Sequence, residues 1–143
     1  MYRSTKDYED APDVEKVAEE VIQDKGMDLS MCDIRYLKVF PHISKTKAGQ
    51  CKALNRREHH LSGGADYVIE MSGELWESLD KDRRYILTWH ELKHVYPVYN
   101  DNKGEWNYKV RNHDVEDFEE ILDQHGADWF SEIKDINSSL YDL

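Results

Sequence analysis

The chain has 143 residues, 39% of them hydrophobic, and its 30 aspartates and glutamates against 19 lysines and arginines give a formal net charge of −11. This length fits a single domain, residues 1–143, and the chain has no apolar run long enough to span a bilayer, so no membrane partner is expected. A strongly negative protein repels phosphate backbones, which argues against direct binding of nucleic acid.

The first residues are polar and do not resemble a secretory signal, so residues 1–10 are expected to be a flexible start. Residues 12–25 then repeat apolar side chains at intervals of three and four, which predicts a helix. Pro12 at its start and Gly26 just past its end support these limits. The cysteines, Cys32 and Cys51, lack a CxxC spacing and are expected to be free thiols in a reducing cytoplasm.

Strands are predicted in the middle of the chain. Residues 34–40 are rich in β-branched and aromatic side chains and stop at Pro41, which predicts a strand. A second strand is expected near residues 51–56, in a segment that is basic by the standards of this chain. Residues 66–72 alternate apolar and polar side chains, which predicts a third strand with one buried face.

The second half of the sequence is mainly helical. A short helix is expected at 73–79, and Asp80 can cap a following helix whose apolar residues lie all around its axis, as in a buried helix. Pro97 is expected to end that helix and residues 99–104 to form a flexible connection. Two C-terminal helices are predicted, over 113–126 and through 129–133. The predicted fold is α+β, with a small twisted sheet of about three strands.

The predicted buried helix carries the sequence HELKH at residues 90–94. Residues four apart lie on one face of a helix, so the imidazoles of His90 and His94 can converge on one metal ion. Zinc bound in this way keeps a position for a water molecule, from which Glu91 is placed to take a proton. The alternative is that both histidines only make hydrogen bonds in the core.

A third metal ligand is expected beyond Pro97. The leading candidate is His113, nineteen residues after His94. A glutamate is the third zinc ligand in another branch of HExxH enzymes. The alternatives to His113 are therefore three glutamates that follow it: Glu116, Glu119 and Glu120.

Two features could serve a peptide substrate. If the strand at 66–72 is a sheet edge beside the zinc cleft, an extended peptide could pair with it through backbone hydrogen bonds. Three tyrosines are candidates to stabilise a developing oxyanion, although tyrosines near a core are more often packing residues: Tyr96, Tyr99 and Tyr108.

Three segments occur in order along the chain: DYVIEMSGELWESL, RRYILTWHELKHV and NHDVEDFEEILDQHGADW. In these segments the chain resembles the family of putative phage metallopeptidases, which are small zincin-like proteins. The resemblance implies a compact α+β zincin core, zinc on His90, His94 and His113, and Glu91 as general base. The chain does not resemble the metzincins, because Pro97 and Asn100 stand where their longer motif needs glycine and histidine.

The function expected from these observations is zinc-dependent hydrolysis of a peptide or protein substrate in the cytoplasm, that of the host if a phage encodes the protein. Two alternatives belong to other classes. The first is an acidic interaction protein, a DNA mimic or a binder of a basic host factor, in which zinc is purely structural. The second is a zincin that binds peptides without cleaving them.

Overall fold

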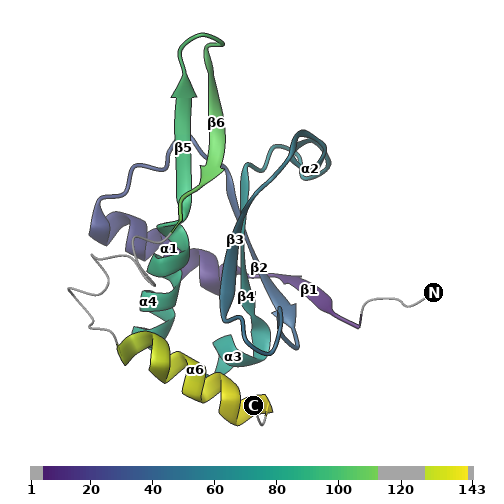
Figure 1. Cartoon of the computed structure of the whole chain (residues 1–143), viewed down its shortest axis with the longest axis vertical. Coiled ribbons are helices and arrows are strands. Elements are labelled where there is room, and N and C mark those ends of the chain that lie inside the picture. The colour runs from purple at the N-terminus through teal and green to yellow at the C-terminus, as the bar shows by residue number, and fades with distance from the viewer. Residues whose placement is uncertain (1–4, 113–127, 142–143) are drawn as a thin grey trace.

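The computed structural model describes residues 5–112 and 128–141. Within these ranges five helices accompany a four-stranded sheet and a two-stranded sheet (Figure 1), which confirms the predicted α+β class. In chain order the elements are β1 (Asp7–Asp10), α1 (Pro12–Lys25), β2 (Ile34–Phe40), β3 (Gly49–Ala53), α2 (Arg56–Leu61), β4 (Tyr67–Ser72), α3 (Gly73–Ser78), α4 (Lys81–Leu92), β5 (Val95–Asn100), β6 (Glu105–Val110) and α6 (Asp128–Tyr141).

The larger sheet has the strand order β1-β2-β4-β3, in which β2 and β4 run parallel and the outer strands pair antiparallel with them. β4 is therefore an inner strand, and it is buried on nearly all of its length. Glu70 is only 7% exposed and accepts a hydrogen bond of 2.7 Å from the Gln50 side chain on β3. The suggestion that residues 66–72 form a sheet edge is wrong, because β3 pairs with β4 and takes the edge position.

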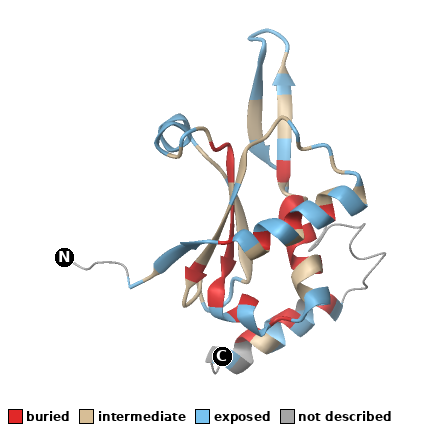
Figure 2. Ribbon diagram, turned by 180° about the vertical axis from the view of Figure 1, so that it is seen from behind, coloured by how far each residue is buried: buried red, intermediate tan, exposed pale blue. Residues whose placement is uncertain are grey.

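The buried residues gather along β4 and α4 (Figure 2). Their side chains, with those of the inner face of α1 and of α3 and α6, form one hydrophobic cluster. The fully buried members of large volume are Trp76, Trp89, Tyr67, Ile69, Met71, Leu75, Leu87, Leu92 and Ile133. The core therefore lies between the helices and one face of the sheet.

Helix α4 begins and is buried as its sequence indicates. Asp80 is its N-cap and accepts a hydrogen bond of 2.9 Å from the backbone N–H of Arg83. Every residue from Ile86 to Leu92 is buried, which confirms a helix covered on most sides. α1 likewise spans Pro12–Lys25 as predicted, and Gly26 closes it in the left-handed conformation, at a φ of 60°.

The structure also contains strands that local sequence patterns did not predict. Residues expected to be a flexible start form β1, which pairs with β2, so the larger sheet has four strands. α4 ends before Pro97, at Leu92, and is followed by the hairpin of β5 and β6. Of the connection expected at 99–104, residues 101–104 are the turn of this hairpin, whereas residues 99 and 100 belong to β5. β3 starts at Gly49, and α2 occupies the end of the second predicted strand.

At the C-terminal end the predicted helix through Trp129 and Ile133 is present as α6. The helix predicted over 113–126 lies outside the described residues. Within the described ranges, no helix combines the length and the apolar character needed to cross a bilayer.

Candidate metal centre

The C-terminal end of α4 and the turn that follows it bring His90, Glu91 and His94 to one cleft. His90 and Glu91 lie in the last turns of the helix and are 5% and 4% exposed. His94 lies two residues after the last residue of α4, yet its backbone N–H still donates to the carbonyl oxygen of Glu91 over 3.1 Å. The turn therefore continues far enough to keep the two imidazoles on the same side of the molecule.

The two imidazoles have the separation that a shared metal ion requires. The ring centroids of His90 and His94 are 5.2 Å apart, and the ring planes meet at 80°. Two imidazoles bound to one zinc ion through nitrogen, with tetrahedral angles and bonds of about 2 Å, would have centroids separated by about 5 Å. The pair fits a shared metal ion in this respect.

The ring of His94 is held in a defined orientation by the end of the hairpin. Its Nδ1 lies 2.6 Å from the carbonyl oxygen of Arg111, the residue that follows β6. Because a carbonyl oxygen only accepts, Nδ1 must carry the proton, and in the neutral ring the lone pair is then on Nε2. Ligating histidines typically donate their second nitrogen in this way, so the contact is compatible with a histidine that binds a metal through Nε2.

Two contacts link this centre to elements on either side. The backbone N–H of Arg111 donates to the carbonyl oxygen of His94 over 2.7 Å, which ties the two ends of the hairpin together. On the other side, the ring of Trp129 on α6 lies 5.2 Å from that of His90 and is 3% exposed. The imidazoles are therefore fixed from both the hairpin and the C-terminal helix.

The cleft has a volume of about 340 Å³, and β3 with the residues before it forms the wall opposite α4. Gly49 makes this close approach possible. A Cβ atom at that position would lie 3.3 Å from Cγ of Glu91 and 2.9 Å from the sulfur of Met71. Local sequence gave no signal for this role, because it depends on a contact between residues far apart in the chain.

Cys51 also lines the cleft, and its thiol is free, as is that of Cys32. Burial raises the pKa of the Cys51 thiol strongly, and the nearby charge of Glu91 raises it further. Burial, with the charge of Asp66, raises the pKa of Cys32 to about 11. Both thiols stay protonated near neutral pH, so neither has the character of an activated nucleophile.

The candidates for the third ligand, His113, Glu116, Glu119 and Glu120, lie outside the described residues. Over residues 5–112 and 128–141, no group of three histidine, cysteine, aspartate or glutamate side chains gathers around a common point that could hold a metal ion. The last residue described before the gap, Asn112, lines the cleft together with His90, Glu91 and His94.

The three tyrosines considered as oxyanion donors do not line this cleft. Tyr96 and Tyr99 lie on the hairpin and are 51% and 47% exposed. The hydroxyl of Tyr108 donates to the carbonyl oxygen of Met31 over 3.2 Å, and its ring packs edge-on against Tyr67. These contacts indicate packing and surface roles for the three side chains.

The α+β fold is compatible with that of a small zincin-like protein, and the two imidazoles lie beside a buried glutamate. A family model described as "Putative phage metallopeptidase" matches residues 6–141, which is nearly the whole chain. The chain belongs to this family, whose name implies a metal-dependent peptidase. No curated protein and no solved structure matches the chain.

Proposed function

We propose that the protein is a zinc-dependent peptidase in which His90 and His94 hold the metal and Glu91 is the general base. One observation carries the proposal: the imidazoles of His90 and His94, 5.2 Å apart, line the same cleft as the Glu91 carboxylate. The hydrogen bond from His94 to Arg111 supports it, because it directs the metal-binding nitrogen away from the hairpin backbone.

When bound, zinc supplies Lewis acidity, which makes a water molecule acidic enough to attack near neutral pH. Glu91 would take the proton of the attacking water and pass it to the leaving amine nitrogen. Its burial favours this role, because electrostatic interactions with developing charge are stronger where water is largely excluded. Gly49 lets Glu91 lie directly against β3.

For the third ligand we propose His113. It directly follows Asn112 in the sequence, and Asn112 is one of the residues that line the cleft. The carboxylates of Glu116, Glu119 and Glu120 are the alternatives. Replacement of His113 by alanine should remove zinc from the purified protein, whereas replacement of His125 should not; retained zinc in the first variant would move the ligand to one of the glutamates.

The proposed substrate is an extended peptide that pairs with β3. This strand ends the order of the larger sheet, so no strand among the described residues forms a ladder of hydrogen bonds with its outer edge. It also contains Gly49, next to Glu91. A peptide hydrogen-bonded to that edge would place a carbonyl group beside the general base.

We propose a reducing cytoplasm as the compartment, that of the host if a phage encodes the protein, which the two free thiols support. The alternative of an acidic interaction protein with structural zinc is not favoured. The family name is that of a peptidase, and Glu91 faces a cleft rather than a closed core.

The deciding experiment combines zinc analysis with turnover of a mixed peptide library by the purified protein. Wild-type protein should bind one zinc ion per chain and cleave peptides. Glu91→Gln should keep the zinc and the fold but lose about 100-fold or more in kcat, since general-base catalysis contributes that much. Glu20→Gln, on the exposed face of α1, is the control and should retain activity. Turnover by Glu91→Gln at the wild-type rate, or wild-type protein free of zinc, would refute the proposal.

A further inference from the structure

Positive charge is concentrated in one short segment of this acidic protein. Residues 45–57 contain five lysines and arginines and no acidic residue. The other 130 residues contain 14 lysines and arginines against 30 aspartates and glutamates. We call these five residues the basic strip: Lys45, Lys47, Lys52, Arg56 and Arg57. Such segregation is a feature of charge-guided binding surfaces.

The basic strip is exposed, and within the described part of the chain none of its members forms an ion pair. Among the described residues, four cations outside the strip do pair with carboxylates: Arg35, Lys38, Arg83 and Arg84. Lys38, for example, lies 2.7 Å from Asp13 and 2.9 Å from Glu77. The acidic residue that follows the strip, Glu58, accepts a hydrogen bond from the backbone N–H of Asn55 in the capping box of α2. The positive charge of the strip is therefore available to a partner.

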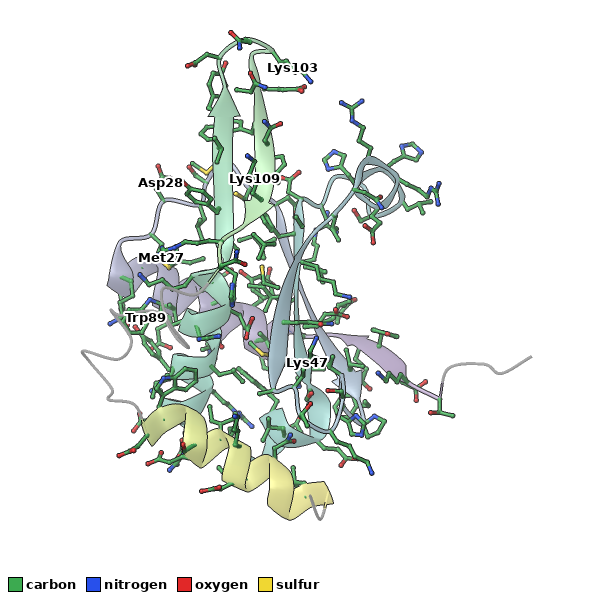
Figure 3. All side chains as sticks on the ribbon, in the orientation of Figure 1. Met27, Asp28, Lys47, Trp89, Lys103 and Lys109 are labelled. Atoms are coloured by element: carbon green, nitrogen blue, oxygen red, sulfur yellow. The ribbon has the colours of Figure 1, made fainter. Side chains whose placement is uncertain are left out.

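The basic strip follows the free edge of β3 from the candidate metal centre to α2. Lys47, labelled in Figure 3, lies just before β3 and lines the cleft with Glu91. Lys52 lies on β3 and lines a hollow on the opposite face of the sheet, so cations flank the edge on both sides. Arg56 begins α2, which projects beyond the end of β3 (Figure 1). The five residues of β3 extend over about 17 Å, the span of a short extended peptide.

We infer that the substrate is an acidic protein segment, bound in extended form along the edge of β3, with carboxylates directed toward Arg56 and Arg57. This inference rests on the proposed peptidase function and adds the class of substrate. An edge strand offers backbone N–H and C=O groups that pair with the regularly spaced backbone groups of an extended peptide. A nucleic acid has no backbone of that pattern. The negative charge of the other 130 residues also disfavours a long polyanion.

The test uses zinc-loaded full-length protein and two pools of internally quenched peptides. The pools share randomised central residues and differ only in their flanks, which are glutamates in one and lysines in the other. We expect kcat/KM to be about tenfold higher or more for the glutamate pool, because several exposed ion pairs replace repulsions. The preference should weaken in about 0.5 M sodium chloride, where exposed charges are screened. Equal cleavage of the two pools would overturn the inference and leave the proposed function standing.

Charge reversal on α2 supplies the residue-level test. The double variant Arg56→Glu/Arg57→Glu should lose the preference for the glutamate pool and cleave the lysine pool faster than wild type. It retains Asn55 and Glu58, which cap α2, so the helix should persist. The matched control is Lys16→Glu/Lys81→Glu, which makes the same change in net charge at exposed positions on α1 and α4. If both double variants changed the preference alike, net charge rather than the basic strip would be responsible, and the assignment would fail.

A binding measurement separates failure of the substrate class from failure of catalysis. The binding of labelled decapeptides to zinc-loaded Glu91→Gln is measured by fluorescence anisotropy. A glutamate-rich decapeptide should bind about tenfold more tightly than a lysine-rich one. Adding Arg56→Glu/Arg57→Glu to this variant should remove the difference. If this binding preference were seen but neither pool were cleaved, the proposed peptidase function would be refuted, and the inference of an acidic binding partner would stand. Equal binding of the two decapeptides, or tighter binding of a labelled single-stranded oligonucleotide, would overturn the acidic-peptide assignment.

Discussion

Helices α2 and α4 carry the same kinds of side chain with different consequences. α2 contains Glu58, His59 and His60 in succession, and none of its residues is buried. α4 contains His90 and Glu91, and its last seven residues are all buried; the second histidine of the pair, His94, lies two residues after its end. Only the second arrangement places two imidazoles side by side in a cleft, with their ring planes nearly perpendicular. Metal-ligand residue types indicate a site when the helical spacing and the burial coincide.

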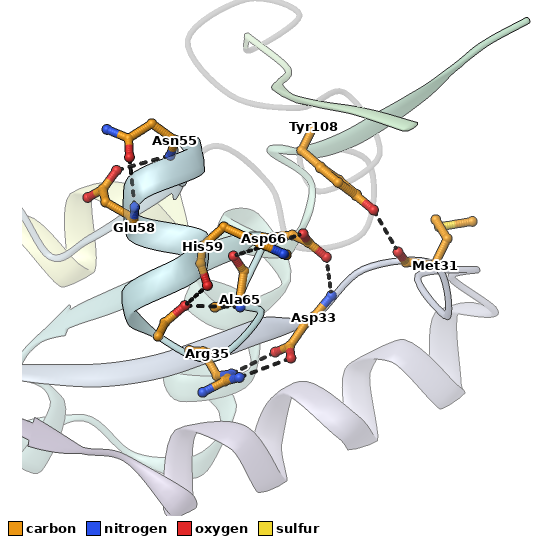
Figure 4. A network of polar contacts seen from close by, with 10 residues as sticks. Met31, Asp33, Arg35, Asn55, Glu58, His59, Ala65, Asp66 and Tyr108 are labelled. Atoms are coloured by element: carbon orange, nitrogen blue, oxygen red, sulfur yellow. Dashed lines mark hydrogen bonds and ion pairs between the residues drawn. The ribbon is translucent and has the colours of Figure 1, made fainter. Parts of the chain in front are cut away.

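The polar groups of α2 are used for folding instead (Figure 4). The Asn55 side chain accepts from the backbone N–H of Glu58 over 2.8 Å, which completes one half of a capping box. Nδ1 of His59 lies 3.0 Å from the carbonyl oxygen of Ala65 and 3.2 Å from Oδ1 of Asp66. These contacts fix the return of the chain from α2 into β4.

Replacing one histidine in each helix should give the largest difference between α2 and α4. His90→Ala removes a proposed ligand and should abolish both zinc binding and cleavage. The zinc-dependent gain in stability, which would be about 4 kcal/mol at a thousandfold excess over Kd, should disappear with it. His60→Ala, on exposed α2, should keep its zinc and its thermal response to added zinc. Zinc analysis with thermal melts measures both, and zinc retained in His90→Ala would contradict the assignment.

The next largest effect should follow from filling the space beside Glu91. Gly49→Ala places a methyl group against Glu91 and Met71, so the carboxylate must shift. We expect kcat to fall by about 10- to 100-fold while zinc stays bound, because small displacements of catalytic groups have effects of this size. Steady-state kinetics on a cleaved peptide, with zinc content as the control, measures it. An unchanged kcat would show that the close approach of Glu91 to β3 is unimportant.

A smaller effect, on stability alone, is expected from replacing Asp66, which contacts His59 of α2. Asp66 is 8% exposed, and its Oδ2 accepts from the backbone N–H of Asp33 over 2.9 Å. Asp66→Ala leaves that donor without its acceptor and should lower the free energy of unfolding by about 1–3 kcal/mol. Urea unfolding gives the value. Zinc binding should be unaltered, and a loss of zinc in this variant would mean that α2 and the metal centre are coupled.

The smallest effect should come from removing the cap of α2. Asn55→Ala removes the acceptor for the N–H of Glu58 and should reduce stability by about 1 kcal/mol, mainly through fraying of this helix. Faster amide hydrogen exchange confined to α2 would show it. Exchange in α4 should stay at the wild-type rate, since its N-cap is Asp80. Parallel acceleration in both helices would instead indicate global destabilisation.

Most elements could be predicted because their determinants are local. The limits of α1 follow from Pro12 and Gly26, the cap of α4 from Asp80, and the position of β2 from a run that stops at a proline. The pairing of His90 with His94 follows from helix geometry, and their cleft with Glu91 is present in the structure. The assignment of zinc and of the third ligand stays a prediction for the variants proposed above.

Other features could not be predicted, because distant parts of the chain produce them. β1 is exposed and has no apolar pattern, so only its pairing with β2 makes it a strand. The hairpin places a proline inside β5, where local preference indicates a helix end followed by a loop. The edge position of β3 depends on strand order, and the roles of Gly49 and of the Arg111 carbonyl depend on what packs against them.

The sequence by itself determined that His90 and His94 lie about one helical turn apart on the same side, with Glu91 next to His90, because helical spacing fixes direction. Only the tertiary structure decided which strand faces Glu91, which carbonyl orients His94, and that the basic strip runs beside the open sheet edge. These relations join residues far apart in the chain, and no local periodicity records which strand lies at the edge of a sheet or which backbone approaches a given side chain.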